Sequence, residues 1–129
     1  MLKQQSGFTL IELIAVLVIL GILAATAVPK FINLSGEAQI AATDSIAGSI
    51  ESASALNHAV DVAVEAGLST DTFETIDDCD DAGNLLAGGL PAGYTVAAVA
   101  VADQVAVTCT LTHTASTDTE DFTIIGANP

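Results

Sequence analysis

The stretch GFTLIELIAVLVILGILAATAVPKF (residues 7–31) decides how the chain is organised, because it is almost wholly apolar. Between residues 8 and 29 the only charged side chain is that of Glu12. A helix of this length would cover about 33 Å, long enough to cross the hydrocarbon core of a bilayer. A carboxylate is costly in lipid, so Glu12 is expected either to lie near the membrane surface or to have a partner.

The residues before the apolar run bear on its topology. Residues 1–7, MLKQQSG, carry Lys3 as their only charge, which favours a cytoplasmic N-terminus and a body on the other side of the membrane. The small residues AATA (24–27) could instead serve as an ordinary signal-peptidase site. A cleaved secretory signal is therefore the alternative to a retained membrane helix.

The charge balance of the whole chain is strongly acidic. Lys and Arg number 2 against 16 Asp and Glu, which gives a formal net charge of -14. With so few basic residues, nucleic acid is not expected as a partner. The sequence has neither a G-x-S-x-G motif nor a glycine-rich phosphate loop, so we expect no enzyme activity and no cofactor.

The residues after Pro29 predict an α+β body. Apolar residues continue at helical spacing to about residue 66, where Gly67 can end the helix. These apolar positions are Phe31, Leu34, Ala38, Ala42, Ile46, Ile50, Ala53, Leu56, Val60 and Val64. Residues 67–93, dense in Gly, Asp and Thr, are expected to form a loop.

A change to alternating apolar and polar residues then predicts strands. YTVAAVAV (94–101) and QVAVTCTLT (104–112) flank Ala102-Asp103 and predict a hairpin, and DFTII (121–125) predicts a third strand. The expected fold is a long N-terminal helix with a hydrophobic first half, whose second half packs on a small antiparallel sheet of three to four strands.

The two cysteines, Cys79 and Cys109, are an even number in a chain whose body is expected outside the cytoplasm. One disulfide is the natural interpretation, with two unpaired thiols as the alternative. In the chain-entropy model, a disulfide that closes a loop of about 31 residues stabilises the fold by about 3.7 kcal/mol.

The run Asp77-Asp78-Cys79-Asp80-Asp81 raises the question of a calcium loop. Counted from Asp78, an EF-hand would need a glutamate where Gly89 stands, so the match fails. A solvated acidic loop is preferred over an irregular calcium site, which stays open. His58 and His113 have no partner at metal-ligand spacing, so no metal site is predicted.

The N-terminal residues resemble those of type IV pilins of the short-leader (type IVa) class. The resemblance covers residues 1 to about 35 and includes Gly7, Phe8, Glu12, Gly21 and Pro29. Together with PKFINLSGEAQ and IAGSIESASAL, the segment is most similar to pilins of the mannose-sensitive haemagglutinin (MSHA) type.

The resemblance implies processing at the start of the chain. Residues 1–7 would be a leader, residues 8–30 a transmembrane and filament-core helix, and residues 31–129 a globular pilin domain with the fold described above. A prepilin peptidase would cut between Gly7 and Phe8 and methylate the new amino group of Phe8.

The resemblance also implies assembly. Glu12 of one subunit would face the positively charged N-terminus at Phe8 of a neighbour, because each charge alone in an apolar filament core would be costly. Gly21 and Pro29 weaken the helix between them, and the resemblance implies that this part melts in the filament.

The function implied is that of the major subunit of a type IV pilus. Such a subunit is stored in the inner membrane and polymerised by a pilus assembly platform into an extracellular homo-oligomeric filament for adhesion. A pseudopilin of a type II secretion system is the first alternative. A monomeric membrane-anchored binding domain is the second, although Glu12 and the Gly7-Phe8 junction would then have no purpose.

Overall fold

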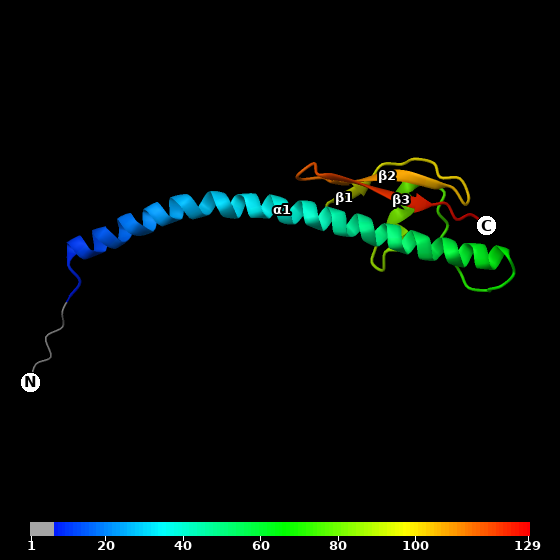
Figure 1. Cartoon of the computed structure of the whole chain (residues 1–129), viewed down its shortest axis with the longest axis horizontal. Coiled ribbons are helices and arrows are strands. Elements are labelled where there is room, and N and C mark those ends of the chain that lie inside the picture. The colour runs from blue at the N-terminus through cyan, green and yellow to red at the C-terminus, as the bar shows by residue number, and fades with distance from the viewer. Residues whose placement is uncertain (1–6) are drawn as a thin grey trace, which may run out of the picture. The chain divides into compact units, whose positions relative to one another are not determined.

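The computed structural model describes residues 7–129, so residues 1–6 of the predicted leader (residues 1–7) lie outside the described part. One α-helix, α1 (Leu10–Glu65), is followed by a short 3-10 helix, η1 (Cys79–Leu85). Three strands then complete the chain: β1 (Tyr94–Val96), β2 (Ala106–His113) and β3 (Thr119–Ile125) (Figure 1). The chain divides into two compact units, Met1–Ala38 and Gln39–Pro129, which we describe separately.

The second unit has the predicted α+β architecture. The strands form one antiparallel sheet in the order β1-β2-β3, and it packs against the second part of α1. The sheet contributes Leu111 from β2 and Phe122 and Ile124 from β3 to the core, where they meet Ile50 of the helix. The fold class expected from the sequence is confirmed, with three strands.

The buried face of α1 differs from the apolar stripe that the sequence predicted. The side chains that it buries are those of Thr43, Ala47, Ile50, Ser54 and Asp61, whereas Leu56 is 71% exposed. The spacing is helical, but three of these residues are polar. Two of them are satisfied: the Ser54 hydroxyl accepts a hydrogen bond from the backbone N–H of Ile125 (2.9 Å), and the Thr43 hydroxyl donates to the Gln39 carbonyl (3.0 Å).

The tight hairpin predicted at Ala102-Asp103 is wrong. β1 ends at Val96, and the chain between β1 and β2 pairs with the segment that leads into η1 instead. The backbone N–H of Cys79 donates to the Val99 carbonyl (2.9 Å), and that of Val101 donates to the Asp77 carbonyl (2.7 Å). These hydrogen bonds satisfy backbone groups that a longer hairpin would have paired across the sheet.

The segment predicted as a loop over residues 67–93 contains η1, and its acidic residues cap that helix. Asp78 accepts hydrogen bonds from the backbone N–H groups of Asp80 and Val99, and Asp81 accepts from that of Asp78 in a capping box. A side-chain hydrogen bond with Asp78 is the main cause that raises the pKa of Asp80, followed by desolvation and nearby negative charge. The acidic run therefore orders the chain locally.

A disulfide joins Cys79, the first residue of η1, to Cys109 in β2. Their Cα atoms are 5.8 Å apart, and both side chains are buried in the core. Since 30 residues separate the two positions along the chain, the bond fixes the connecting segment to the middle strand of the sheet.

Candidate functional site

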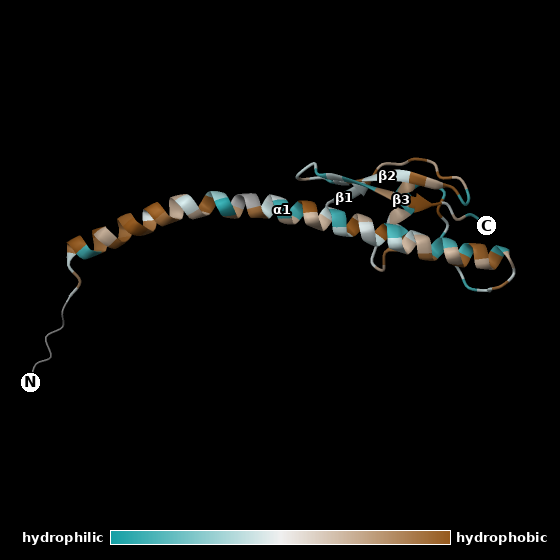
Figure 2. Ribbon diagram, viewed as in Figure 1, coloured by the Kyte–Doolittle hydropathy of each residue, from teal (hydrophilic) through white to brown (hydrophobic). Residues whose placement is uncertain are grey.

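The first unit contains the apolar part of α1. Each residue from Gly7 to Phe31 is exposed, although most are large and apolar. Figure 2 shows this concentration of hydrophobic residues near the start of the helix. The helix is long and apolar enough to cross a membrane. An apolar surface of this extent is typical of a segment that contacts lipid or other proteins.

The helix starts with a capping box built from Thr9 and Glu12. The Glu12 carboxylate accepts hydrogen bonds from the backbone N–H of Thr9 (2.8 Å) and from its hydroxyl (2.7 Å). In return the Thr9 hydroxyl accepts one from the backbone N–H of Glu12 (3.3 Å). The negative charge also lies in the first turn, where it interacts favourably with the helix dipole.

Thr9 was not singled out from the sequence, although the signal is present. The spacing Thr-x-x-Glu before an apolar run is the signature of a capping box. Both hydrogen bonds that Thr9 donates reach the same oxygen, Oε2 of Glu12. The other oxygen, Oε1, accepts no hydrogen bond within the described part of the chain. Glu12 can therefore cap its own helix and still offer an oxygen to an external cation.

Gly7 and Phe8 precede the helix in an open environment. Phe8 is 85% exposed, and a Cβ added at Gly7 would meet no described atom within 4 Å. Packing within the described chain therefore does not require glycine at this position. A glycine here leaves the backbone accessible to an enzyme that has to approach it closely.

α1 continues through Gly21 and Pro29 without interruption. Pro29 has no N–H, so it cannot donate the usual helical hydrogen bond to the carbonyl of Ala25. One turn earlier, the Thr26 hydroxyl donates to the Leu23 carbonyl (2.9 Å). The melting predicted between Gly21 and Pro29 concerns a filament and stays a prediction.

The two histidines lie in different surroundings in the second unit. The ring of His113 is 5.0 Å from that of Tyr94, and its Nδ1 lies 2.7 Å from the Ser116 hydroxyl. The Nδ1 of His58 is 3.8 Å from a carboxylate oxygen of Asp61. The sequence placed Asp61 on a face of the helix away from the predicted apolar stripe, whereas the structure buries its side chain completely.

Comparisons with known proteins identify the apolar segment. The family model of the prokaryotic N-terminal methylation motif matches residues 2–28. The chain is 49% identical over 53 residues to the type IV narrow pilus major component PilA5 of Thermus thermophilus, covering 41% of this chain and 46% of that protein. It is 55% identical over 38 residues to the type II secretion system core protein G of Pseudomonas aeruginosa, covering 30% of this chain and 27% of that protein. No solved structure matches.

These matches show what kind of protein the chain is similar to. Residues 2–28 match the N-terminal methylation motif, and the chain has similarity to a type IV pilus component and to a core protein of a type II secretion system. The matches span less than half the length of each of these two relatives. The homology supports the resemblance to type IV pilins, and the narrower resemblance to the MSHA type stays a prediction.

Proposed function

We propose that this chain is the major subunit of a type IV pilus, held in the inner membrane before it is polymerised into an extracellular filament for adhesion. The observation that carries the proposal is the capped, fully exposed apolar helix that begins directly after the Gly7-Phe8 junction. Its apolar side chains have no counterpart in the described part of the chain, so lipid and then neighbouring subunits would cover them.

Processing of the junction would create the partner that Glu12 lacks. Cleavage between Gly7 and Phe8 by a prepilin peptidase would leave an N-methylated, positively charged amine on Phe8. The free oxygen of Glu12 in a neighbouring subunit could then accept a hydrogen bond from this amine. In an apolar filament core the two groups would neutralise each other and fix the register between subunits.

The division of the chain that we propose follows from this role. Residues 1–7 would be the leader and residues 8–30 the membrane and filament-core segment. Residues 31–129 would form the globular domain, periplasmic before assembly and on the filament surface afterwards. Gly21 and Pro29 would let the helix loosen within the filament. The acidic body is the part that would face water.

The alternative that an observation favours is a pseudopilin. The similarity to the type II secretion system core protein G extends over 38 residues at 55% identity. A pseudopilin would use the same processing and the same Glu12 contact. It would differ in where the filament is found, because it would stay within the cell envelope.

The first experiment is intact-mass and N-terminal analysis of protein sheared from the surface of cells that express the chain. We expect a chain that begins at N-methylated Phe8 and contains the disulfide. Processed chain that stays in the membrane fraction and is absent from the sheared fraction would favour the pseudopilin. A surface form that begins after Ala27 would contradict both.

A second experiment tests the assembly role of Glu12. We expect Glu12→Gln to be cleaved and to accumulate in the membrane while sheared filaments fall at least tenfold, because the neutral amide cannot pair with the amine. Glu37→Gln is the matched control, since Glu37 is also an exposed acid on the first unit of α1. Equal filament yields for the two variants would contradict the proposed contact.

A further inference from the structure

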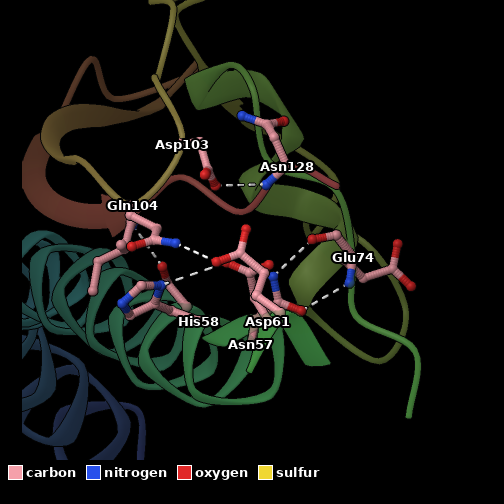
Figure 3. Close-up of polar contacts among 10 residues, drawn as sticks. Asn57, His58, Asp61, Glu74, Asp103, Gln104 and Asn128 are labelled. Carbon is pink, nitrogen blue, oxygen red and sulfur yellow. Dashed lines mark hydrogen bonds and ion pairs between the residues drawn. The ribbon is translucent and has the colours of Figure 1, made fainter. Parts of the chain in front are cut away.

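Three carboxylates meet in the second unit, away from the apolar segment. Asp61 and Glu65 lie one turn apart at the end of α1, and Asp103 lies in the connection between β1 and β2. One oxygen of each lies within 4.8 Å of the others. Figure 3 shows Asp61 and Asp103 in this region together with Gln104 and His58.

Asp61 is the unusual member of this cluster because it is completely buried. Its exposed fraction is 0%, and neither of its carboxylate oxygens has a hydrogen-bond partner. A buried carboxylate normally accepts several hydrogen bonds or pairs with a cation, because desolvation of an unpaired charge costs several kcal/mol. No described residue donates a hydrogen bond to the Asp61 carboxylate, so its charge requires a partner of another kind.

The composition of the second unit limits what that partner can be. The chain has 2 basic residues, Lys3 and Lys30, and both belong to the first unit. Among residues 7–129, His58 is the basic group near Asp61, at 3.8 Å, and its Nδ1 has no hydrogen-bond partner there either. Even a charged His58 would balance only one of the three negative charges.

The neighbouring contacts hold the cluster in place and leave oxygens free. The backbone N–H of Asn128 donates to Oδ1 of Asp103 (3.0 Å), and the side-chain amide of Gln104 donates to Oε2 of Glu65. Each of these carboxylates keeps a second oxygen. Two oxygens bound to the same calcium ion at about 2.4 Å cannot be more than about 4.8 Å apart, so the spacing is compatible with a shared ion.

We propose that Asp61, Glu65 and Asp103 bind a calcium ion. The donor set is entirely oxygen, which suits hard cations and disfavours zinc and copper. Three carboxylates and completing waters fit the flexible coordination of calcium better than the strict octahedron of magnesium. The ion neutralises Asp61 and links the end of α1 to the connection between β1 and β2. Because Asp103 accepts a hydrogen bond from Asn128, the ion also links the helix to the C-terminal residues.

This site is distinct from the acidic run at residues 77–81. There, the carboxylates of Asp78 and Asp81 already accept backbone hydrogen bonds as caps of η1. The calcium site also differs from the proposed filament contact, since it uses no residue of the first unit. Its presence or absence therefore leaves the proposal for Glu12 unaffected.

The test is calcium binding by the full chain in detergent micelles, after treatment with EDTA and removal of the chelator. Titration calorimetry with calcium chloride should give a dissociation constant near 10⁻⁴ M, roughly the range of extracellular calcium modules. Calcium at about 100 times this constant should raise the midpoint of thermal unfolding by on the order of 10 °C. Magnesium chloride should give a smaller rise.

Variants then assign the site. Asp103→Asn and Glu65→Gln change exposed side chains, so they should fold and weaken calcium binding at least tenfold. Asp61→Asn should raise the unfolding midpoint in EDTA, because it removes a buried charge, and should abolish the response to calcium. Asp44→Asn, an exposed acid on the same helix, should keep the full response.

Two results would overturn the proposal. One is the absence of any calcium response in the unmodified chain. The other is a response that Asp103→Asn and Glu65→Gln both retain, which would place the ion elsewhere. If His58→Gln lowers the unfolding midpoint and calcium has no effect, the partner of Asp61 is the histidine.

Discussion

The two parts of α1 differ in what they bury within the molecule. The first unit is the more hydrophobic and buries none of its residues from Gly7 to Phe31. The second unit buries Thr43, Ser54 and Asp61 of the helix together with Ala47 and Ile50. The helix therefore uses small and polar residues beside apolar ones for its inner contacts, whereas its more hydrophobic first part is suited to contacts outside the molecule.

Two phenylalanines, one in each unit, test this difference most directly. Phe122 is 1% exposed in the core of the second unit, and Phe31 is 70% exposed on the helix. Phe122→Ala should lower the free energy of unfolding by about 3–5 kcal/mol, because it removes buried apolar surface and leaves a cavity. Phe31→Ala should change it by less than about 0.5 kcal/mol.

Urea unfolding of the full chain in detergent, followed by near-ultraviolet circular dichroism, measures both variants. A large loss of stability in Phe31→Ala would mean that the first unit packs on the body, and the contrast between the two units would fail. If both variants fold, Phe31→Ala should lower the filament yield more than Phe122→Ala.

The disulfide tests whether the two units are stabilised separately. It joins η1 to β2 within the second unit, so its removal by Cys79→Ser with Cys109→Ser should lower the stability of the body by about 3.7 kcal/mol. Hydrogen exchange followed by mass spectrometry should show faster exchange in body peptides. Peptides from residues 10–28 should exchange as before.

Reduction of the unmodified chain with dithiothreitol is the control, and it should reproduce the effect of the double variant. The double variant itself should not respond to the reductant. Faster exchange in residues 10–28 would indicate that the body supports the apolar part of the helix.

The elements that the sequence predicted well are those with a long, regular pattern. The apolar run at residues 7–31 and the continuing helical spacing predicted α1, and the alternating residues around Cys109 predicted the middle strand. The Thr9–Glu12 cap was also readable, because its signal is local in sequence.

What the sequence could not predict depends on contacts between distant residues. The connection between β1 and β2 pairs with the residues before η1, so the alternation in 94–101 was mistaken for a long strand. The buried face of α1 follows the position of the sheet rather than hydropathy, since Ser54 meets the backbone of Ile125. Asp61 and Asp103 are brought together only by the fold.

Two glycines provide the last and smallest comparison between the units. A Cβ added at Gly126 would lie 2.1 Å from the carbonyl oxygen of Ala102, where real Cβ atoms do not occur. Gly126→Ala should therefore force the backbone apart and lower the free energy of unfolding by about 1–3 kcal/mol. A Cβ at Gly21 would meet no atom of the described residues within 4 Å.

Gly21→Ala should leave the stability of the body unchanged and stabilise the helix locally by roughly 0.5–1 kcal/mol, because alanine loses less backbone entropy than glycine. Urea unfolding measures the first effect, and hydrogen exchange of peptides that contain residue 21 measures the second. Equal losses of body stability in the two variants would mean that Gly21 is packed, which its open surroundings contradict. Because the same substitution is made in both units, the difference between the results reports only the surroundings: close backbone contact at Gly126 in the body, and open space at Gly21 on the apolar part of the helix.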